Sequence, residues 1–216
     1  MIEKRRNIYL VRHGVTAWNR EMRLQGQTDI PLDAEGMAQA QCVALRLASL
    51  PNPPQALISS DLTRAKQTAH AIAEQLGLPV HAMPEIRETH LGYWEGLNQA
   101  EIIARGEEDQ LRKYQENSFL HRPPGAEELE SAWERMINAL ATIKAQFPTE
   151  HIAIVGHGGS LRVLLYDALG APVSSLNRIW LANASLSIIE ERFREGNLFK
   201  RGVSLLNDVS HLQKAE

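Results

Sequence analysis

The sequence has one cysteine, no excess of basic residues and no long apolar run. Cys42 has no partner for an internal disulfide, which fits a reducing compartment, and its apolar neighbours predict a small buried hydrophobe. With 23 Lys and Arg against 26 Asp and Glu, the formal net charge is -3, so no long-range field attracts nucleic acid or an anionic membrane. No apolar stretch has the length of a membrane span or of a signal peptide. We therefore expect a cytoplasmic protein that binds neither nucleic acid nor a membrane.

The length and composition are those of an ordinary globular domain. The 216 residues are 44% hydrophobic and 23% charged, without a repeat or a low-complexity stretch. Such a chain can bury one core of useful size. We therefore expect a single domain over residues 1–216, with an irregular stretch at about 92–125 that we interpret as a lid inserted into the main fold.

Short apolar runs alternate with helical patterns along the chain. Continuous apolar runs at residues 8–11, 56–59 and 152–155 are typical of strands buried on both faces. Apolar residues recur at helical spacing between and after these runs, over residues 37–47, 62–76, 129–147 and 161–169. This alternation predicts an α/β fold, a three-layer sandwich with a mostly parallel central sheet flanked by helices. Residues 185–192 alternate in polarity and are a candidate edge strand.

Histidine, glycine and arginine gather where the expected strands end. The first strand ends at Arg12 and His13, and the last ends next to His157. The middle strand leads into a helix whose first turn carries Arg64. Because ligands bind at the carboxyl ends of the strands in open α/β sheets, two histidines and two arginines should converge at one edge of the sheet.

These side chains suit phosphoryl transfer. Guanidinium groups bind phosphate oxygens bidentately and stay charged at every relevant pH. A neutral imidazole can attack phosphorus and form a phosphohistidine, and a second imidazole can donate to the equatorial oxygens of the transition state. A single histidine at a strand end is usually a polar filler, but three strand ends with matching residues favour a phosphate site.

Motifs spread in order over nearly the whole chain resemble those of one family. Residues 10–19 read LVRHGVTAWN, residues 59–65 read SSDLTRA, and residues 155–159 read VGHGG. Further matching segments are residues 24–32, 87–96, 183–187 and 207–212. In these motifs the chain resembles the histidine phosphatase superfamily, in its cofactor-dependent phosphoglycerate mutase branch.

The resemblance implies a role for each matching residue. His13 would be the phosphorylated nucleophile, and Glu88 would donate a proton to the leaving oxygen. Arg12, Arg64 and His157 would complete the phosphate pocket. The phosphate or substrate side would be lined by Asn19, Gln25, Gly26 and Gly158. The implied partner is a small phosphorylated metabolite.

The residues alone support a carboxylic acid in the mechanism without selecting one. A carboxylate beside a phosphate dianion sees a like charge, which favours its protonated form, and it can then protonate the leaving alkoxide and activate water. Glu85, Glu88 and Glu95 are equal candidates by pattern, and the resemblance selects Glu88. The histidines lack the spacing of metal ligands and the aspartates lack the pattern of a magnesium loop, so we expect neither a metal nor a cofactor.

Three functions are compatible with this resemblance. A phosphatase is favoured over a phosphoglycerate mutase, because residues 96–123 are short and partly acidic and because Leu91 stands where the mutases usually have Tyr. A catalytically degraded binding module is the third alternative, and the intact set of catalytic candidates counts against it. The turn at residues 123–128 departs from the family's frequent version at Ala126 and Glu128. The sequence leaves the substrate, and the choice between monomer and homo-oligomer, open.

Overall fold

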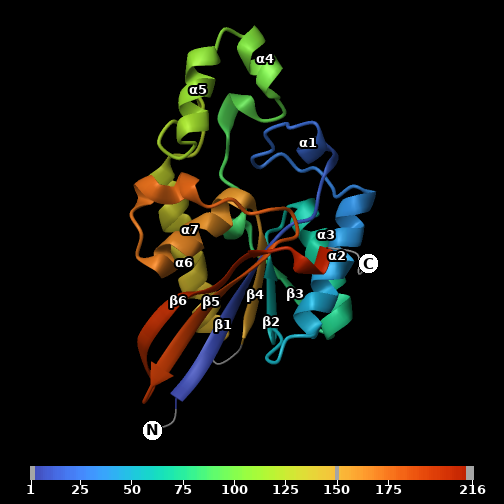
Figure 1. Cartoon of the computed structure of the whole chain (residues 1–216), viewed down its shortest axis with the longest axis vertical. Helices are drawn as coiled ribbons and strands as arrows, with labels where there is room; N and C mark the ends of the chain where they lie inside the picture. Colours follow the sequence, from blue (N-terminus) through green and yellow to red (C-terminus); the bar gives the residue numbers. More distant parts are fainter. Residues whose placement is uncertain (1–2, 149–150, 213–216) are drawn as a thin grey trace.

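In the computed structural model, which describes residues 3–148 and 151–212, the strands form one six-stranded sheet. Their order across the sheet is β3-β2-β4-β1-β5-β6 (Figure 1). The first four of these run parallel to one another, whereas β5 and β6 pair antiparallel. The bounds are Glu3–Arg12 for β1, Ala56–Ser59 for β2, Val80–Ala82 for β3, Ile152–Gly156 for β4, Leu186–Arg194 for β5 and Asn197–Asp208 for β6.

Alternate residues of the central strands pack under different helices. Ile8 and Leu10 of β1 belong to a core shared with α6 and α7, whereas Tyr9 and Val11 belong to a core shared with α2 and α3. Successive strand side chains point to opposite faces, so both faces are covered. These helices span Ala34–Ala48 (α2), Thr63–Leu76 (α3), Leu129–Gln146 (α6) and Gly158–Leu169 (α7). The expected three-layer α/β architecture is confirmed.

Two helix ends follow directly from local chemistry. The Asp33 carboxylate accepts a hydrogen bond from the Gly36 backbone N–H at 2.8 Å and so caps the start of α2. At the end of α3, Gly77 adopts the left-handed conformation with φ 66°, which a residue without Cβ reaches at little cost. Aspartate and glycine are the residue types favoured at these two positions, so both helix ends follow from residue type.

Two expectations about the periphery were wrong. The candidate edge strand is β5, and it lies inside the sheet because β1 pairs with one side and β6 with the other. The strand β6 has no counterpart among the predicted strands, because its residues are mostly exposed or half-buried and therefore give no apolar run. Cys42 is partly buried and is not a core residue.

Among the described residues, no helix is long and apolar enough to cross a bilayer.

Residues 92–125 contain more regular structure than their sequence indicates. They form the 3₁₀ turn Gly92–Trp94 (η2) and two helices, Gln99–Ala104 (α4) and Glu108–Glu116 (α5), which stand above the rest of the molecule in Figure 1. A separate small core of Trp94, Ile102 and Leu111 holds them together. The remaining short elements are α1 (Ala17–Arg20), η1 (Pro84–Ile86), η3 (Val173–Arg178) and η4 (Ser210–Leu212).

Candidate active site

Three adjacent strands deliver the candidate site residues to one edge of the sheet. β1 ends at Arg12 and is followed by His13, β4 ends just before His157, and β2 leads to Arg64 in the first turn of α3. Arg12, His13 and Arg64 line a pocket of about 280 Å³. Its lining consists of Arg12, His13, Asn19, Arg23, Leu24, Gln25, Gly26, Arg64, Glu88, Leu91, Tyr114, Gly158, Gly159, Arg162, Trp180 and Leu181.

His13 is held as a neutral imidazole with one defined tautomer. Its Nδ1 lies 2.7 Å from the Gly14 carbonyl oxygen. A carbonyl only accepts, so Nδ1 carries the ring proton and Nε2 keeps its lone pair. Burial, and then the positive charges of Arg64 and Arg12, hold the pKa of His13 well below its ordinary value of 6.5. The ring is therefore neutral at pH 7, as a nucleophile requires.

The two arginines differ in how they are fixed. Arg64 is buried, and its Nη1 and Nη2 each donate to a backbone carbonyl, those of Thr28 and Gly26, at 2.7 Å. Arg12 donates through Nη1 to the Leu181 carbonyl, while its buried Nε has no partner among the described residues. Burial lowers the pKa of Arg12 to about 10 and also lowers that of Arg64. Both guanidinium groups remain cationic at pH 7, and an anion in the pocket would satisfy Arg12 Nε.

His157 lies behind the pocket and does not line it. The ring is fully buried, and its centroid is 5.2 Å from that of His13. Arg64 Nε donates to its Nδ1 at 3.2 Å, so Nε2 carries the proton and faces Ser60 Oγ at 2.9 Å. Burial and Arg64 hold the pKa of His157 well below 6.5. Both nitrogens are thus engaged, and the donation to phosphate expected from the sequence would require one of these contacts to break.

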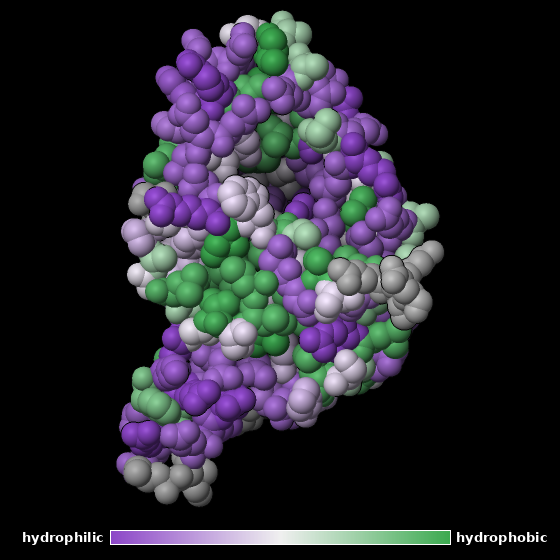
Figure 2. Space-filling model, in the orientation of Figure 1, coloured by the Kyte–Doolittle hydropathy of each residue, from purple (hydrophilic) through white to green (hydrophobic). Residues whose placement is uncertain are grey.

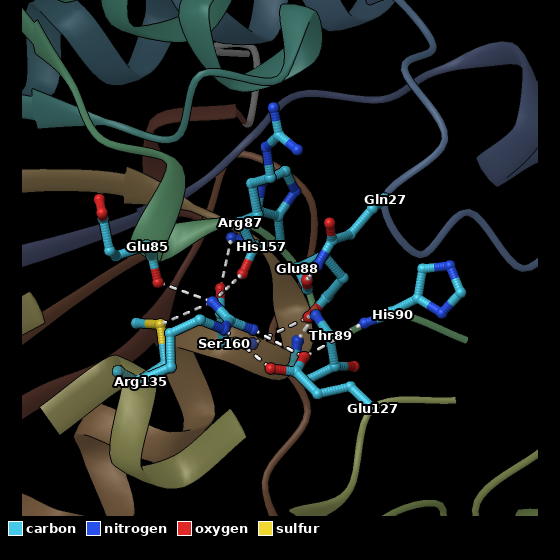
Figure 3. Close-up of polar contacts among 12 residues, drawn as sticks. Gln27, Glu85, Arg87, Glu88, Thr89, His90, Glu127, Arg135, His157 and Ser160 are labelled. Atoms are coloured by element: carbon cyan, nitrogen blue, oxygen red, sulfur yellow. Dashed lines mark hydrogen bonds and ion pairs between the residues drawn. The ribbon is translucent and has the colours of Figure 1, made fainter. Parts of the chain in front are cut away.

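Glu88 is seated on the first turn of α7 (Figure 3). Its Oε2 accepts from the Gly159 N–H at 2.8 Å, and its Oε1 accepts from the N–H groups of Ser160 and Thr89 at 2.9 and 2.8 Å. Free N–H groups at a helix N-terminus suit such an acceptor. A Cβ on Gly159 would lie 2.4 Å from Glu88 Oε1, so this approach requires glycine.

The two competing carboxylates are placed elsewhere. Glu85 is exposed, and Figure 3 shows its side chain pointing away from Glu88 and His157. Glu95 accepts from the Gln27 and Leu91 backbone N–H groups at 2.9 and 3.0 Å and ties two loops together. Of the three acids that the pattern left open, only Glu88 lines the pocket.

The four expected binding residues all line the pocket. Asn19 Oδ1 accepts from the Asn183 amide at 3.2 Å, which ties α1 to the loop before β5. Gln25 donates to Thr16 Oγ1 at 2.9 Å, and its buried Oε1 has no partner among the described residues. Gly26 and Gly158 contribute carbonyls that orient arginines, Arg64 in the first case and Arg162 in the second.

Known proteins are similar to this chain over almost its full length. The model of the histidine phosphatase superfamily (branch 1) matches residues 8–201. The chain belongs to this superfamily.

Its relatives include both phosphatases and mutases. A curated relative named "Probable phosphoglycerate mutase GpmB" from Escherichia fergusonii is 36% identical over 207 residues, which are 95% of this chain and 94% of the relative. The solved mycobacterial glucosyl-3-phosphoglycerate phosphatase has a TM-score of 0.82 at 29% identity, covering 94% of this chain and 99% of that one. The α-ribazole phosphatase of Shigella flexneri has a TM-score of 0.79 at 26% identity, with 94% and 96% covered.

The pocket also contains residues outside the predicted set. Arg162 lies one turn after Gly158 on α7, and its guanidinium stacks on the Phe119 ring at 4.6 Å. Burial lowers its pKa. Its i+4 spacing from Gly158 was a readable signal, because such residues share one helix face. Tyr114 and Trp180 come from a helix and a loop that carry no motif, and no local signal marks them.

Nothing in the described residues assembles three or more histidine, cysteine, aspartate or glutamate side chains into a metal-binding group. Metal independence stays a prediction. The pocket offers guanidinium groups, one imidazole with a free lone pair and one carboxyl group within the same cavity. This set can bind a phosphate dianion and exchange its ester bond for a bond to nitrogen.

Proposed function

We propose that this chain is a phosphomonoesterase that works through a phosphohistidine on His13 and needs no metal ion. The tautomer of His13 carries this proposal. Its Nδ1–H is committed to the Gly14 carbonyl, and the ring lines a pocket shared with Arg12 and Arg64. A neutral Nε2 with its lone pair available is what nucleophilic attack on phosphorus needs.

In the first half-reaction, Arg12 and Arg64 bind the phosphate oxygens, and the Nε2 lone pair attacks phosphorus. The bond from phosphorus to the ester oxygen breaks, and that oxygen takes its electron pair and a proton from Glu88. A carboxyl group has about four lone-pair sites, and three backbone N–H groups already hold Glu88 in place. The remaining site on Oε2 suits the proton that is transferred.

In the second half-reaction, the Glu88 carboxylate takes a proton from water while the water oxygen attacks phosphorus. The P–N bond breaks, its electron pair returns to His13 Nε2, and inorganic phosphate leaves. His157 supports both steps indirectly, because its contact with Arg64 Nε holds that guanidinium against the pocket. The α4–α5 pair would act as the lid over this chemistry.

A phosphoglycerate mutase is the second candidate, and Arg162 is the observation that favours it. A mutase must hold a bisphosphorylated intermediate with extra cations, and Arg162 adds a further guanidinium to the pocket. Arg23 adds little net charge, because Glu21 and Glu101 pair with it at 2.7 and 2.6 Å. The buried Leu91 in the pocket wall offers no polar group to a second phosphate. We therefore favour the phosphatase.

Product analysis distinguishes the two candidates. The enzyme would be given 3-phosphoglycerate and, separately, p-nitrophenyl phosphate in ¹⁸O-labelled water, and the phosphorus products would be followed by NMR. A phosphatase releases inorganic phosphate that carries solvent oxygen from each substrate it accepts. Formation of 2-phosphoglycerate with little free phosphate, stimulated by 2,3-bisphosphoglycerate, would replace the phosphatase proposal by the mutase. Turnover of neither substrate by the folded protein would support the binding module.

A further inference from the structure

A second, larger cavity adjoins the phosphate pocket. Its volume is about 580 Å³, and Leu24 and Tyr114 line both cavities. Its wall comes from the loop after α1 and from helices α4 and α5. The lining residues are Glu21, Met22, Leu24, Asn98, Gln99, Ala100, Ile102, Ile103, Leu111, Tyr114 and Gln115. Figure 2 shows the surface hollowed between the α4–α5 pair and the α1 region, with hydrophobic surface beside the hollow.

Apolar side chains are left open to solvent at this cavity. Met22 is 81% exposed and Ile103 is 40% exposed, and both contribute to its wall. A single exposed apolar residue needs no explanation, but apolar residues gathered in a concave site next to a reactive pocket mark a ligand site. The phosphoryl group itself occupies the neighbouring pocket, so the cavity is available to the rest of the substrate.

The charge of the cavity wall restricts what enters it. No Lys or Arg belongs to its lining, and its one ionisable acid is Glu21. A leaving group that carries a carboxylate or a second phosphate would find no counter-charge in this lining, where Glu21 is already paired with Arg23 at 2.7 Å. An uncharged apolar group would instead be transferred from water onto Met22, Ile103 and Leu111, which is favourable in proportion to the area buried.

We propose that the substrate is a phosphomonoester whose uncharged alcohol portion carries an extended apolar group, and that this group passes Leu24 and Tyr114 into the cavity. This inference rests on the proposed phosphatase function. It places the selection of substrate on Met22 and on the α4–α5 pair. The small polyanionic phosphoglycerates do not belong to this class.

The test uses ethyl, butyl and hexyl phosphate with the full-length enzyme. These esters release alkoxides of similar basicity, so differences in kcat/KM report binding of the chain and not the chemistry. Each buried CH₂ should raise kcat/KM about fourfold, which corresponds to ~0.8 kcal/mol. The wild-type enzyme should therefore prefer hexyl over ethyl phosphate by about two orders of magnitude.

Variants locate that preference. Ile103→Asp and Met22→Asp each place a carboxylate on the cavity wall, and aspartate tolerates the positive φ of 53° at Met22 better than most residues. Each should lower the hexyl-to-ethyl ratio at least tenfold. Leu45→Asp is the matched control, because Leu45 is an exposed apolar residue of α2 that lines neither cavity. Its ratio should equal that of the wild type.

The possible outcomes distinguish failure of this inference from failure of the proposed phosphatase function. The inference is overturned if the wild-type ratio of kcat/KM for hexyl over ethyl phosphate is near one, or if this ratio is unchanged in both aspartate variants. In that case, hydrolysis of p-nitrophenyl phosphate would still support the phosphatase proposal. If the folded wild type hydrolyses neither p-nitrophenyl phosphate nor any alkyl phosphate, the phosphatase proposal fails and the inference falls with it. A rising series that both aspartate variants flatten and Leu45→Asp preserves supports it.

Discussion

Replacing Gly159 by alanine should separate catalysis from stability. The new Cβ would lie 2.4 Å from Glu88 Oε1, whereas ordinary contact begins near 3.4 Å, so the carboxyl group must retreat by about 1 Å (3.4 minus 2.4). The obstructed atoms are the end of a flexible side chain, and Glu88 can swing away without moving the backbone. A displacement of about 1 Å in a catalytic group costs roughly 10²-fold in rate.

The same substitution should not weaken the fold. Gly159 lies in the first turn of α7 and its φ is not positive, so alanine fits the backbone there. Alanine is favoured over glycine in helices by up to about 1 kcal/mol, which offsets the loss of the Glu88 contacts. For a chain of this size the melting temperature should change by no more than about 4 °C.

The assay compares two leaving groups at the phosphorylation step. Gly159→Ala should lose about 10²-fold in single-turnover phosphorylation by an alkyl phosphate, and less with p-nitrophenyl phosphate, whose leaving group needs little protonation. Gly202→Ala is the control, since nothing lies within 4 Å of the Cβ it would gain. If the alkyl phosphate phosphorylated Gly159→Ala at the wild-type rate, or if both substrates lost rate equally, the proposed role of Glu88 held against the first turn of α7 would be refuted.

Three further outcomes follow from the same site. Glu88→Gln should reduce turnover of alkyl phosphates by about 10²–10⁴-fold without loss of fold by circular dichroism, and intact activity would remove Glu88 from the mechanism. Dialysis against EDTA should leave kcat/KM unchanged, and loss that magnesium or zinc restores would contradict metal independence. Because the pKa values of His13 and His157 are lowered on folding, the unfolded chain binds more protons below pH 6.5. The free energy of unfolding should therefore fall as the pH is lowered from 6.5, and it should fall less steeply in His157→Asn than in the wild type. An equally steep fall in the variant and the wild type would count against neutral buried histidines.

The sequence was most informative where burial on both faces leaves a continuous apolar run. The strands at residues 8–11, 56–59 and 152–155 are of this kind, and the residues that follow them suffice to predict that Arg12, His13 and Arg64 meet at one edge of the sheet. The strand β6 has no continuous apolar run, because an antiparallel edge strand that faces solvent does not need one. The helix α4 has only six residues, and α5 is polar apart from Leu111 and Tyr114, so neither gives an apolar pattern long enough to predict a helix.

The site itself shows which information is three-dimensional. Glu85, Glu88 and Glu95 are indistinguishable by pattern, and what separates them is the contact between one carboxyl group and the start of a helix about seventy residues later. The hydrogen-bond partners of His157 are likewise set by Ser60 and Arg64 from another strand end. Residue type predicted the chemistry, and packing between distant segments decided which atom is available for it.

The central claim is that His13 carries the phosphoryl group, and trapping the intermediate tests it most directly. The enzyme would be quenched in alkali within milliseconds of mixing with p-nitrophenyl phosphate and digested for peptide mass spectrometry. We predict a phosphoryl group on the peptide containing His13, bound to a ring nitrogen, labile in acid and absent from His13→Ala. Turnover by a folded His13→Ala variant at the wild-type rate, or a phosphoryl group found on His157 in its place, would contradict the account.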